Sequence, residues 1–236
     1  MALLHTGFFS QALGMCVSCD VILPQFSSSL IGMKTAAARG PRKVLYLLHG
    51  MSDDETIWQR RTSIERYAAP LGLAVVMPAA QISRYANMAH GGRYFDYIAD
   101  ELPETMRGFF GFSDRREDNF IAGLSMGGFH SLHISKQYPD MFDYVGLFSA
   151  AIMPGKDVNS PIYENTDAKL KAQFAKNPKL YWIAIGKTDF LYKANEEFRK
   201  KLDENGYKYI YKETDGGHIW KNWRIYLSDF TPMLFK

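Results

Sequence analysis

Three residue types that together perform acyl transfer occur in a suggestive order along this chain: a serine, then an acid, then a histidine. The serine, Ser125, lies in "GLSMG", residues 123–127, between a strand-like "NFIAGL" and a helix-like "GGFHSLHISKQY". A G-x-S-x-G pentapeptide at a strand-to-helix turn is typical of a nucleophile elbow, in which side chains at the glycine positions would collide with the neighbouring strand and helix. The pattern predicts that Ser125 is a nucleophile; the alternative is a small residue in a structural turn.

A serine hydroxyl needs a base to take its proton, and that base is usually a histidine. His218 lies in "TDGGHIW", after the last strand-like segment, where two glycines allow the loop to fold back over the sheet edge. It also follows the serine in chain order, as a hydrolase elbow requires. We therefore predict His218 as the base, with a helix-capping loop histidine as the alternative. The other histidines are less suitable by position: His5, His49, His90, His130 and His133.

An acid between Ser125 and His218 would fix the histidine tautomer and stabilise the imidazolium. Asp189 follows the strand-like "LYWIAIG" by a short turn, so we expect it at the same sheet edge as Ser125. Asp189 could instead be only the N-cap of the following helix. Four further aspartates occupy the interval in less suitable positions: Asp157, Asp167, Asp203 and Asp215.

Acyl transfer also needs amide donors for the oxyanion that forms during attack. Met126, directly after the serine, supplies one backbone N–H. The second comes from "LYLLHGM", residues 45–51, where a strand-like run ends in a glycine. We predict the Met51 amide, with Gly50 as the nearby alternative, and expect His49 to hold this loop.

These residues require a sheet that brings separate chain segments to one edge. Strand-like runs alternate with helix-like segments, which predicts a mostly parallel sheet covered on both faces. The expected strands are 16–24, 43–50, 73–80, 119–124, 144–150, 180–186 and 207–214, and the expected helices are 55–72, 93–110, 127–139, 190–206 and 219–235. "SDDE", residues 52–55, has capping-box spacing, and "NG" at 205–206 suits a helix C-terminus.

Length and composition bound the class of protein. The 236 residues, 47% hydrophobic and 22% charged, suit one domain over 1–236, with the irregular stretch 151–179 as a short cap or substrate-facing insertion. A net charge of +3 gives no indication of a nucleic-acid partner. No window is long and apolar enough for a membrane span, and the N-terminus lacks a basic n-region, so we expect a soluble cytoplasmic protein.

The two cysteines, Cys16 and Cys19, form a CxxC inside an expected strand. Residues three apart on a strand point to opposite faces, and two thiols make only half of a tetrahedral zinc site. We interpret them as reduced packing residues, and expect no metal and no cofactor.

The chain resembles the esterase D group of α/β-hydrolases, especially the compact tributyrin-esterase-like members. The resemblance spans nearly the whole chain through "LLHGMSDDETIWQRRT", "VVMPAA", "FDYIADELP", "FIAGLSMGGF", "GKTDFLYKAN" and "GGHIW". It implies the α/β-hydrolase fold, a metal-independent serine carboxylesterase, and the triad Ser125, Asp189 and His218. Relatives also suggest self-association, so a homo-oligomer is expected.

The expected reaction is hydrolysis of small-molecule, short-chain acyl esters through an acyl-enzyme. The candidates for lining the substrate pocket are Gly50, Trp58, Tyr85, Trp220 and the 151–179 stretch; alternatively, the aromatic residues are core. A feruloyl or acetyl-xylan esterase is the main alternative function. An S-formylglutathione-type thioesterase, an acyltransferase and a noncatalytic binding scaffold are further alternatives.

Overall fold

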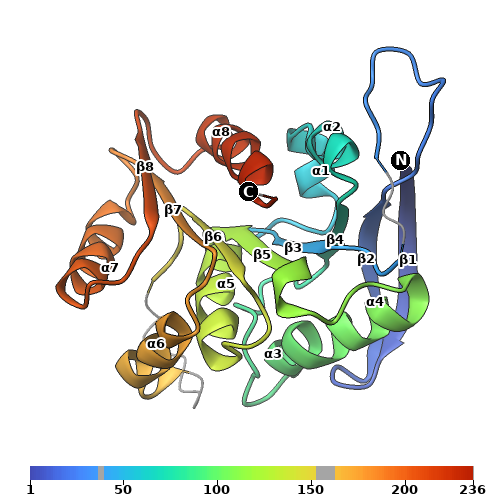
Figure 1. Cartoon of the computed structure of the whole chain (residues 1–236). Helices are drawn as coiled ribbons and strands as arrows, with labels where there is room; N and C mark the ends of the chain where they lie inside the picture. Colours follow the sequence, from blue (N-terminus) through green and yellow to red (C-terminus); the bar gives the residue numbers. More distant parts are fainter. Residues whose placement is uncertain (37–39, 153–162, 236) are drawn as a thin grey trace.

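The part of the chain that the structure describes forms one eight-stranded sheet. The computed structural model describes residues 1–36, 40–152 and 163–235 (Figure 1). The strand order is β1-β2-β4-β3-β5-β6-β7-β8; β1 and β2 run antiparallel to their neighbours, and the remaining pairs are parallel. The strands are β1 Ala2–Ser10, β2 Met15–Leu23, β3 Val44–Leu48, β4 Ala74–Pro78, β5 Asn119–Leu124, β6 Tyr144–Phe148, β7 Leu180–Gly186 and β8 Ile210–Thr214. This architecture confirms the predicted mostly parallel α/β sheet.

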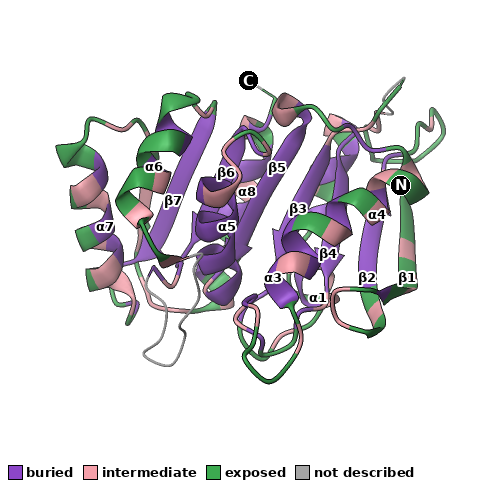
Figure 2. Ribbon diagram, turned by 90° about the horizontal axis from the view of Figure 1, so that it is seen from below, coloured by how far each residue is buried: buried purple, intermediate pink, exposed green. Residues whose placement is uncertain are grey.

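Helices cover both faces of the sheet and enclose two hydrophobic cores. The helices are α1 Ile57–Arg61, α2 Ile64–Ala68, η1 Ala69–Leu71, α3 Tyr94–Asp96, the π-helical η2 Tyr97–Glu101, α4 Leu102–Phe110, η3 Arg116–Asp118, α5 Met126–Gln137, α6 Thr166–Ala175, α7 Tyr192–Glu204, α8 Trp220–Phe230 and η5 Thr231–Met233. Helices α1, α2 and α8 pack on one face, and α3 to α7 on the other (Figure 1). The inner strands are buried along their length, as Figure 2 shows, because both faces are covered.

The first strand was not predicted, and two predicted helices differ from the structure. The expected helix over 55–72 is interrupted at Thr62, whose backbone is extended. The capping box at 52–55 is wrong: the Asp54 carboxylate accepts the Thr56 amide at 2.9 Å, whereas Glu55 accepts the Ser18 hydroxyl. The helix over 93–110 contains the π-helical η2. In contrast, α7 does end before Gly206, which adopts φ +68°.

The predicted insertion at 151–179 contains an unpredicted helix, α6. Residues 153–162 of that stretch lie outside the described part of the chain. Among the described residues, no helix is both long and apolar enough to cross a membrane.

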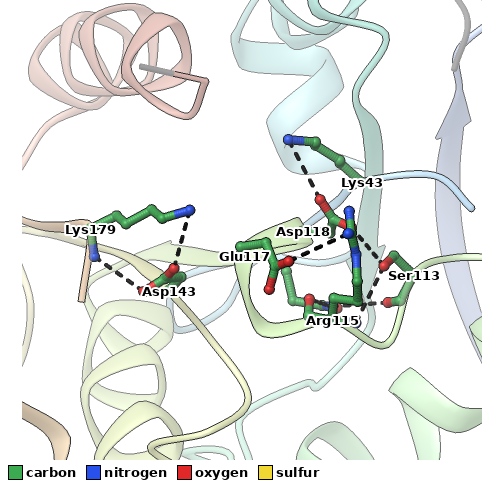
Figure 3. Close-up of polar contacts among 8 residues, drawn as sticks. Lys43, Ser113, Arg115, Glu117, Asp118, Asp143 and Lys179 are labelled. Carbon is green, nitrogen blue, oxygen red and sulfur yellow. Dashed lines mark hydrogen bonds and ion pairs between the residues drawn. The ribbon is translucent and has the colours of Figure 1, made fainter. Parts of the chain in front are cut away.

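Paired charges anchor the amino-terminal edge of the sheet (Figure 3). Asp118, just before β5, accepts hydrogen bonds from Ser113 at 2.7 Å and from the Arg115 guanidinium at 2.7 and 2.8 Å, with the Lys43 ammonium 3.5 Å away. Although burial would raise the pKa of Asp118, these hydrogen bonds and the neighbouring cations hold it below its usual value. The negative charge of Asp118 at this edge is therefore compensated by hydrogen bonds and by neighbouring cations.

Candidate active site

Ser125 is held between β5 and α5 in a strained backbone conformation. Its φ of 52° lies in the left-handed region that a residue with a side chain rarely adopts. Hydrogen bonds from the Ser125 amide to the Phe148 carbonyl, at 2.9 Å, and from the Ala151 amide to the Ser125 carbonyl, at 3.1 Å, fix this conformation. Non-glycine strain of this kind concentrates at functional sites.

The glycines on either side of Ser125 are required by close packing of main chain on main chain. A Cβ on Gly123 would lie 2.5 Å from the Gly127 carbonyl carbon, and a Cβ on Gly127 would lie 2.5 Å from the Leu48 carbonyl oxygen. Both separations are far inside van der Waals contact. The turn from strand to helix therefore has the geometry of a nucleophile elbow.

His218 and Asp189, predicted from separate loops, form a hydrogen-bonded pair. The His218 Nδ1 lies 2.9 Å from Asp189 Oδ2 and 3.1 Å from Oδ1. The Asp189 side chain is fully buried, whereas that of His218 is 17% exposed. Burial would raise the pKa of Asp189, but hydrogen bonds from His218 and the Leu191 amide outweigh it and lower this pKa. The ionised carboxylate therefore favours a proton on Nδ1 and leaves Nε2 as the basic nitrogen.

Backbone contacts join the loop that carries His218 to the loop that carries Asp189. The Thr188 amide donates to the Gly216 carbonyl at 3.0 Å, and the buried Asn222 side chain donates to the Gly217 carbonyl at 3.0 Å. A Cβ on Gly186 would lie 2.2 Å from the Gly216 carbonyl oxygen. The small residues around His218 thus let the two loops come close enough for the acid to meet the base.

Ser125 and His218 line one cavity of about 370 Å³ at the carboxyl edge of the sheet. Its walls are mostly apolar, with a few polar and charged groups. The full lining comprises Gly50, Met51, Asp53, Arg84, Leu124, Ser125, Met126, Phe129, Ala151, Phe190, Leu191, His218 and Trp223. An apolar cavity with convergent polar groups is the usual form of a small-molecule site.

The loop after β3 is held by His49, as expected. The His49 Nε2 accepts the Ala80 amide at 2.9 Å, so its Nδ1 carries the proton that it donates to the Gly50 carbonyl at 2.7 Å. Burial lowers the pKa of His49, which agrees with this neutral form. This loop places Gly50 and Met51 in the wall of the cavity. Within the described residues, neither the Met51 nor the Met126 amide donates a backbone hydrogen bond outside a helix or strand, so no such bond competes with an oxyanion for these donors.

The structure places the predicted aromatic residues away from this cavity. Trp58 is completely buried and donates its indole N–H to the Leu48 carbonyl, and Tyr85 is completely buried with its hydroxyl on the His49 carbonyl. Trp220 packs edge-on against Trp58 and is absent from the cavity lining. The structure therefore supports the interpretation of these aromatic residues as core. Of the predicted substrate contacts, Gly50 and Ala151, the first residue of the 151–179 stretch, line the cavity.

Two aromatic residues that the sequence reasoning missed pack directly on the histidine. The Phe190 and Trp223 rings lie 4.6 Å and 4.9 Å from the His218 ring, and both line the cavity. Phe190 follows Asp189 directly, so its position next to the predicted acid was an available signal. Trp223 could have been found from its place one turn into the helix after His218.

The competing acids have other contacts or lie outside the described residues. Asp167 pairs with Lys201, Asp203 accepts the Tyr209 hydroxyl, and the exposed Asp215 pairs with Lys187; Asp157 is not among the described residues. The cysteines are both free, Cys16 exposed and Cys19 buried, so they do lie in different environments on β2.

The sheet order and the serine elbow at its carboxyl edge define a serine hydrolase of the α/β-hydrolase fold. The chain belongs to the Esterase family, described as "Putative esterase", which it matches over residues 10–234. It is a serine esterase that hydrolyses carboxylic esters.

Individual relatives cover almost all of the chain. It is 28% identical to an acetyl esterase of Caldicellulosiruptor saccharolyticus, over 97% of this chain and 96% of that protein. It is 32% identical to the fluorophosphonate-binding serine hydrolase FphF of Staphylococcus aureus, solved with substrate bound, with a TM-score of 0.83 over 100% of this chain and 99% of the other. The S-formylglutathione hydrolase FrmB of Staphylococcus aureus is also 32% identical, with a TM-score of 0.80 over 99% and 98% of the two chains.

Proposed function

We propose that this protein is a short-chain carboxylesterase with acetyl esters among its substrates, and that Ser125, His218 and Asp189 are its catalytic triad. One observation carries the triad: His218 bonds to a buried, ionised Asp189 while sharing a single cavity with the strained Ser125. The full-length likeness to an acetyl esterase supports the short acyl group.

The proposed reaction proceeds through two acyl transfers. His218 Nε2 takes the Ser125 proton as the hydroxyl attacks the ester carbonyl, and Asp189 stabilises the imidazolium that results. The Met51 and Met126 amides hold the negative oxygen of the tetrahedral intermediate. His218 then protonates the leaving alcohol, and an acyl-enzyme remains. Water repeats the attack, with His218 again as the base, and releases the acid.

The apolar walls favour a short acyl chain in the cavity. Leu124 and Phe129 supply apolar surface beside Ser125, and the volume of about 370 Å³ admits a small ester. No cofactor takes part in this scheme. A cytoplasmic location and self-association complete the proposal; the free Cys16 thiol on the surface suits a reducing compartment.

The test measures hydrolysis of 4-nitrophenyl acetate, butyrate and octanoate beside methyl ferulate, acetylated xylan and S-formylglutathione. We expect the highest kcat/KM on acetate or butyrate, and loss of both activity and fluorophosphonate labelling in Ser125→Ala. Ser228→Ala, on α8 and outside the cavity, is the control and should match the parent. Labelling that persists in Ser125→Ala would remove Ser125 from the mechanism, and a preference for ferulate, xylan or the thioester would reassign the substrate.

A further inference from the structure

One charged group in the cavity has no role in the proposed ester hydrolysis: the guanidinium of Arg84. It lies in the loop after β4, is partly buried, and lines the same cavity as Ser125 and His218. Throughout residues 1–36, 40–152 and 163–235, the Arg84 side chain has neither a hydrogen bond nor an ion pair. An arginine is always charged and presents five N–H donors, so removing it partly from water without a partner is unfavourable.

The backbone around Arg84 is held in place at some cost. Arg84 and Tyr85 have φ of 54° and 53°, both in the left-handed region. The buried Tyr85 anchors this conformation, because its hydroxyl bonds to the His49 carbonyl at 3.0 Å and its ring stacks on His130 at 4.9 Å. The position of Arg84 is therefore tied to the loop that carries the proposed oxyanion amide, and such strain concentrates where function requires it.

The other charges of the cavity are engaged elsewhere. The Asp53 carboxylate contacts the Gly50 backbone, and burial raises its pKa, which weakens it as a partner for a cation. His218 is directed to Asp189. Burial raises the pKa of Tyr163 to about 12, and the positive charge of Arg84 acts on this phenol to oppose the rise. Arg84 thus remains a cation available to a ligand in a mostly apolar cavity.

We propose that Arg84 is a specificity-determining residue that binds a carboxylate on the substrate, so that the preferred esters are acidic. This proposal rests on the proposed esterase function and names its substrate class. The planar guanidinium matches a carboxylate in a two-point contact, and such charge-assisted hydrogen bonds are about twice as strong as neutral ones. The carboxylate can belong to the acyl part or to the alcohol part of the ester.

Two matched substrate pairs separate these sources. The acyl pair is 4-nitrophenyl hydrogen succinate and its neutral methyl ester, 4-nitrophenyl methyl succinate. The alcohol pair is 4-acetoxybenzoate and methyl 4-acetoxybenzoate. Within each pair only the carboxylate changes, so the ratio of the two kcat/KM values isolates its recognition.

In Arg84→Gln we expect the acidic-to-neutral ratio of one pair to fall about tenfold to a hundredfold, mainly through KM. Arg84→Lys keeps the charge without the planar fork and should recover part of the ratio. Arg93→Gln is the control, since Arg93 lies on the same loop region outside the cavity and pairs with Asp96 at 2.7 Å. It should leave both ratios unchanged.

An unchanged ratio for both pairs in Arg84→Gln overturns the proposal, even where esterase activity is intact. Lack of turnover of all four esters by the parent enzyme, together with no fluorophosphonate labelling, would instead overturn the proposed function. Should Arg84→Gln fail to fold, the parent enzyme still decides: raising the salt concentration should increase KM for one acidic ester and leave its neutral partner unaffected. Equal salt responses within both pairs also overturn the proposal.

Discussion

Replacement of Lys136 by methionine should make the protein more stable at neutral pH, although it removes a hydrogen bond. Lys136 lies on α5, eleven residues after Ser125, and only 1% of its surface is exposed. Its ammonium contacts the Thr166 hydroxyl at 3.1 Å, and within the described residues no carboxylate forms an ion pair with it. Burial lowers its pKa from 10.5 to about 7, with the Lys169 and Lys201 charges adding to the effect and Asp167 opposing it.

The sign and size of the effect follow from this pKa. The folded protein binds the Lys136 proton only below about pH 7, whereas the unfolded chain binds it below about 10.5. The free energy of unfolding therefore falls as pH decreases from 10.5 to 7, and the loss is complete below 7. At about 1.4 kcal/mol for each pKa unit, the full penalty is roughly 5 kcal/mol. At pH 7 the folded protein holds this proton about half of the time, so slightly more than 4 kcal/mol of the penalty applies there. The lost Thr166 bond offsets about 1 kcal/mol, so Lys136→Met should gain about 3 kcal/mol at pH 7.

Urea unfolding followed by tryptophan fluorescence at pH 7, 8.5 and 10 measures this gain. The difference between variant and parent should shrink towards zero at pH 10, and taking the difference cancels the titration of the buried tyrosines, which both proteins share. Lys171→Met, at an exposed position on α6, controls for the loss of one positive charge. A Lys136→Met protein that is no more stable than the parent at pH 7, or a difference that does not change with pH, would refute the reasoning.

Three further outcomes are expected. Asp189→Asn should lower kcat on 4-nitrophenyl acetate by about 10⁴-fold with little change in KM, because the amide favours the wrong histidine tautomer; a loss below tenfold would exclude Asp189 as the acid. Burial lowers the pKa of His130 to about 3, so stability is lost as pH falls below the unfolded value of about 6.5. His130→Phe should therefore gain about 2 kcal/mol more at pH 5 than at pH 8 in urea unfolding, and an equal gain at both would contradict this. Gly127→Ala should prevent folding or melt far below the parent, whereas Gly108→Ala, with nothing within 4 Å of the added Cβ, should gain about 0.5–1 kcal/mol; similar melting temperatures for the two would rule out the close contact at the elbow.

The parallel strands and the acid–histidine contact could be predicted because each leaves a local signal. A strand buried on both faces reads as a continuous apolar run, and the residues that follow such strands meet at one edge of the sheet. The position of Asp189 after β7 and of His218 after β8 was therefore available from the sequence. Their 2.9 Å contact agrees with that prediction. The catalytic roles of the two residues remain a proposal, which the variants described above test.

The elements that were missed leave weaker or conflicting signals. In the edge strand β1, exposed residues alternate with partly buried ones, so the strand contains no continuous buried apolar run. The break near Thr62 is associated with local side-chain hydrogen bonds: the Thr62 hydroxyl donates to the Trp58 carbonyl and accepts the Ile64 amide. Helix propensity alone does not register such a competing bond.

The cavity lining could not be read from residue type, because core and pocket use the same side chains. Trp58 and Trp223 both belong to the core beneath α1 and α8, yet only Trp223 reaches the cavity. The two rings differ in their contacts: Trp58 is completely buried with its indole N–H on the Leu48 carbonyl, whereas Trp223 packs edge-on against His218. A pattern of apolar spacing fixes the buried face of a helix but not its position along the strands.

The charged groups near the cavity differ from those at the amino-terminal edge of the sheet in how they are paired. At the amino-terminal edge, Asp118 and Asp143 each have cationic partners. Those of Asp143 are Arg116 at 3.1 Å and Lys179 at 3.7 Å, the second of which Figure 3 shows. At the carboxyl edge, Asp189 meets a histidine instead of a permanent cation, and Arg84 has no partner among the described side chains. A charge whose partner is built into the fold is already compensated, whereas one without a partner keeps its interaction energy for a ligand. The Arg84 guanidinium at the carboxyl edge is therefore available for an electrostatic interaction with an ester in the cavity.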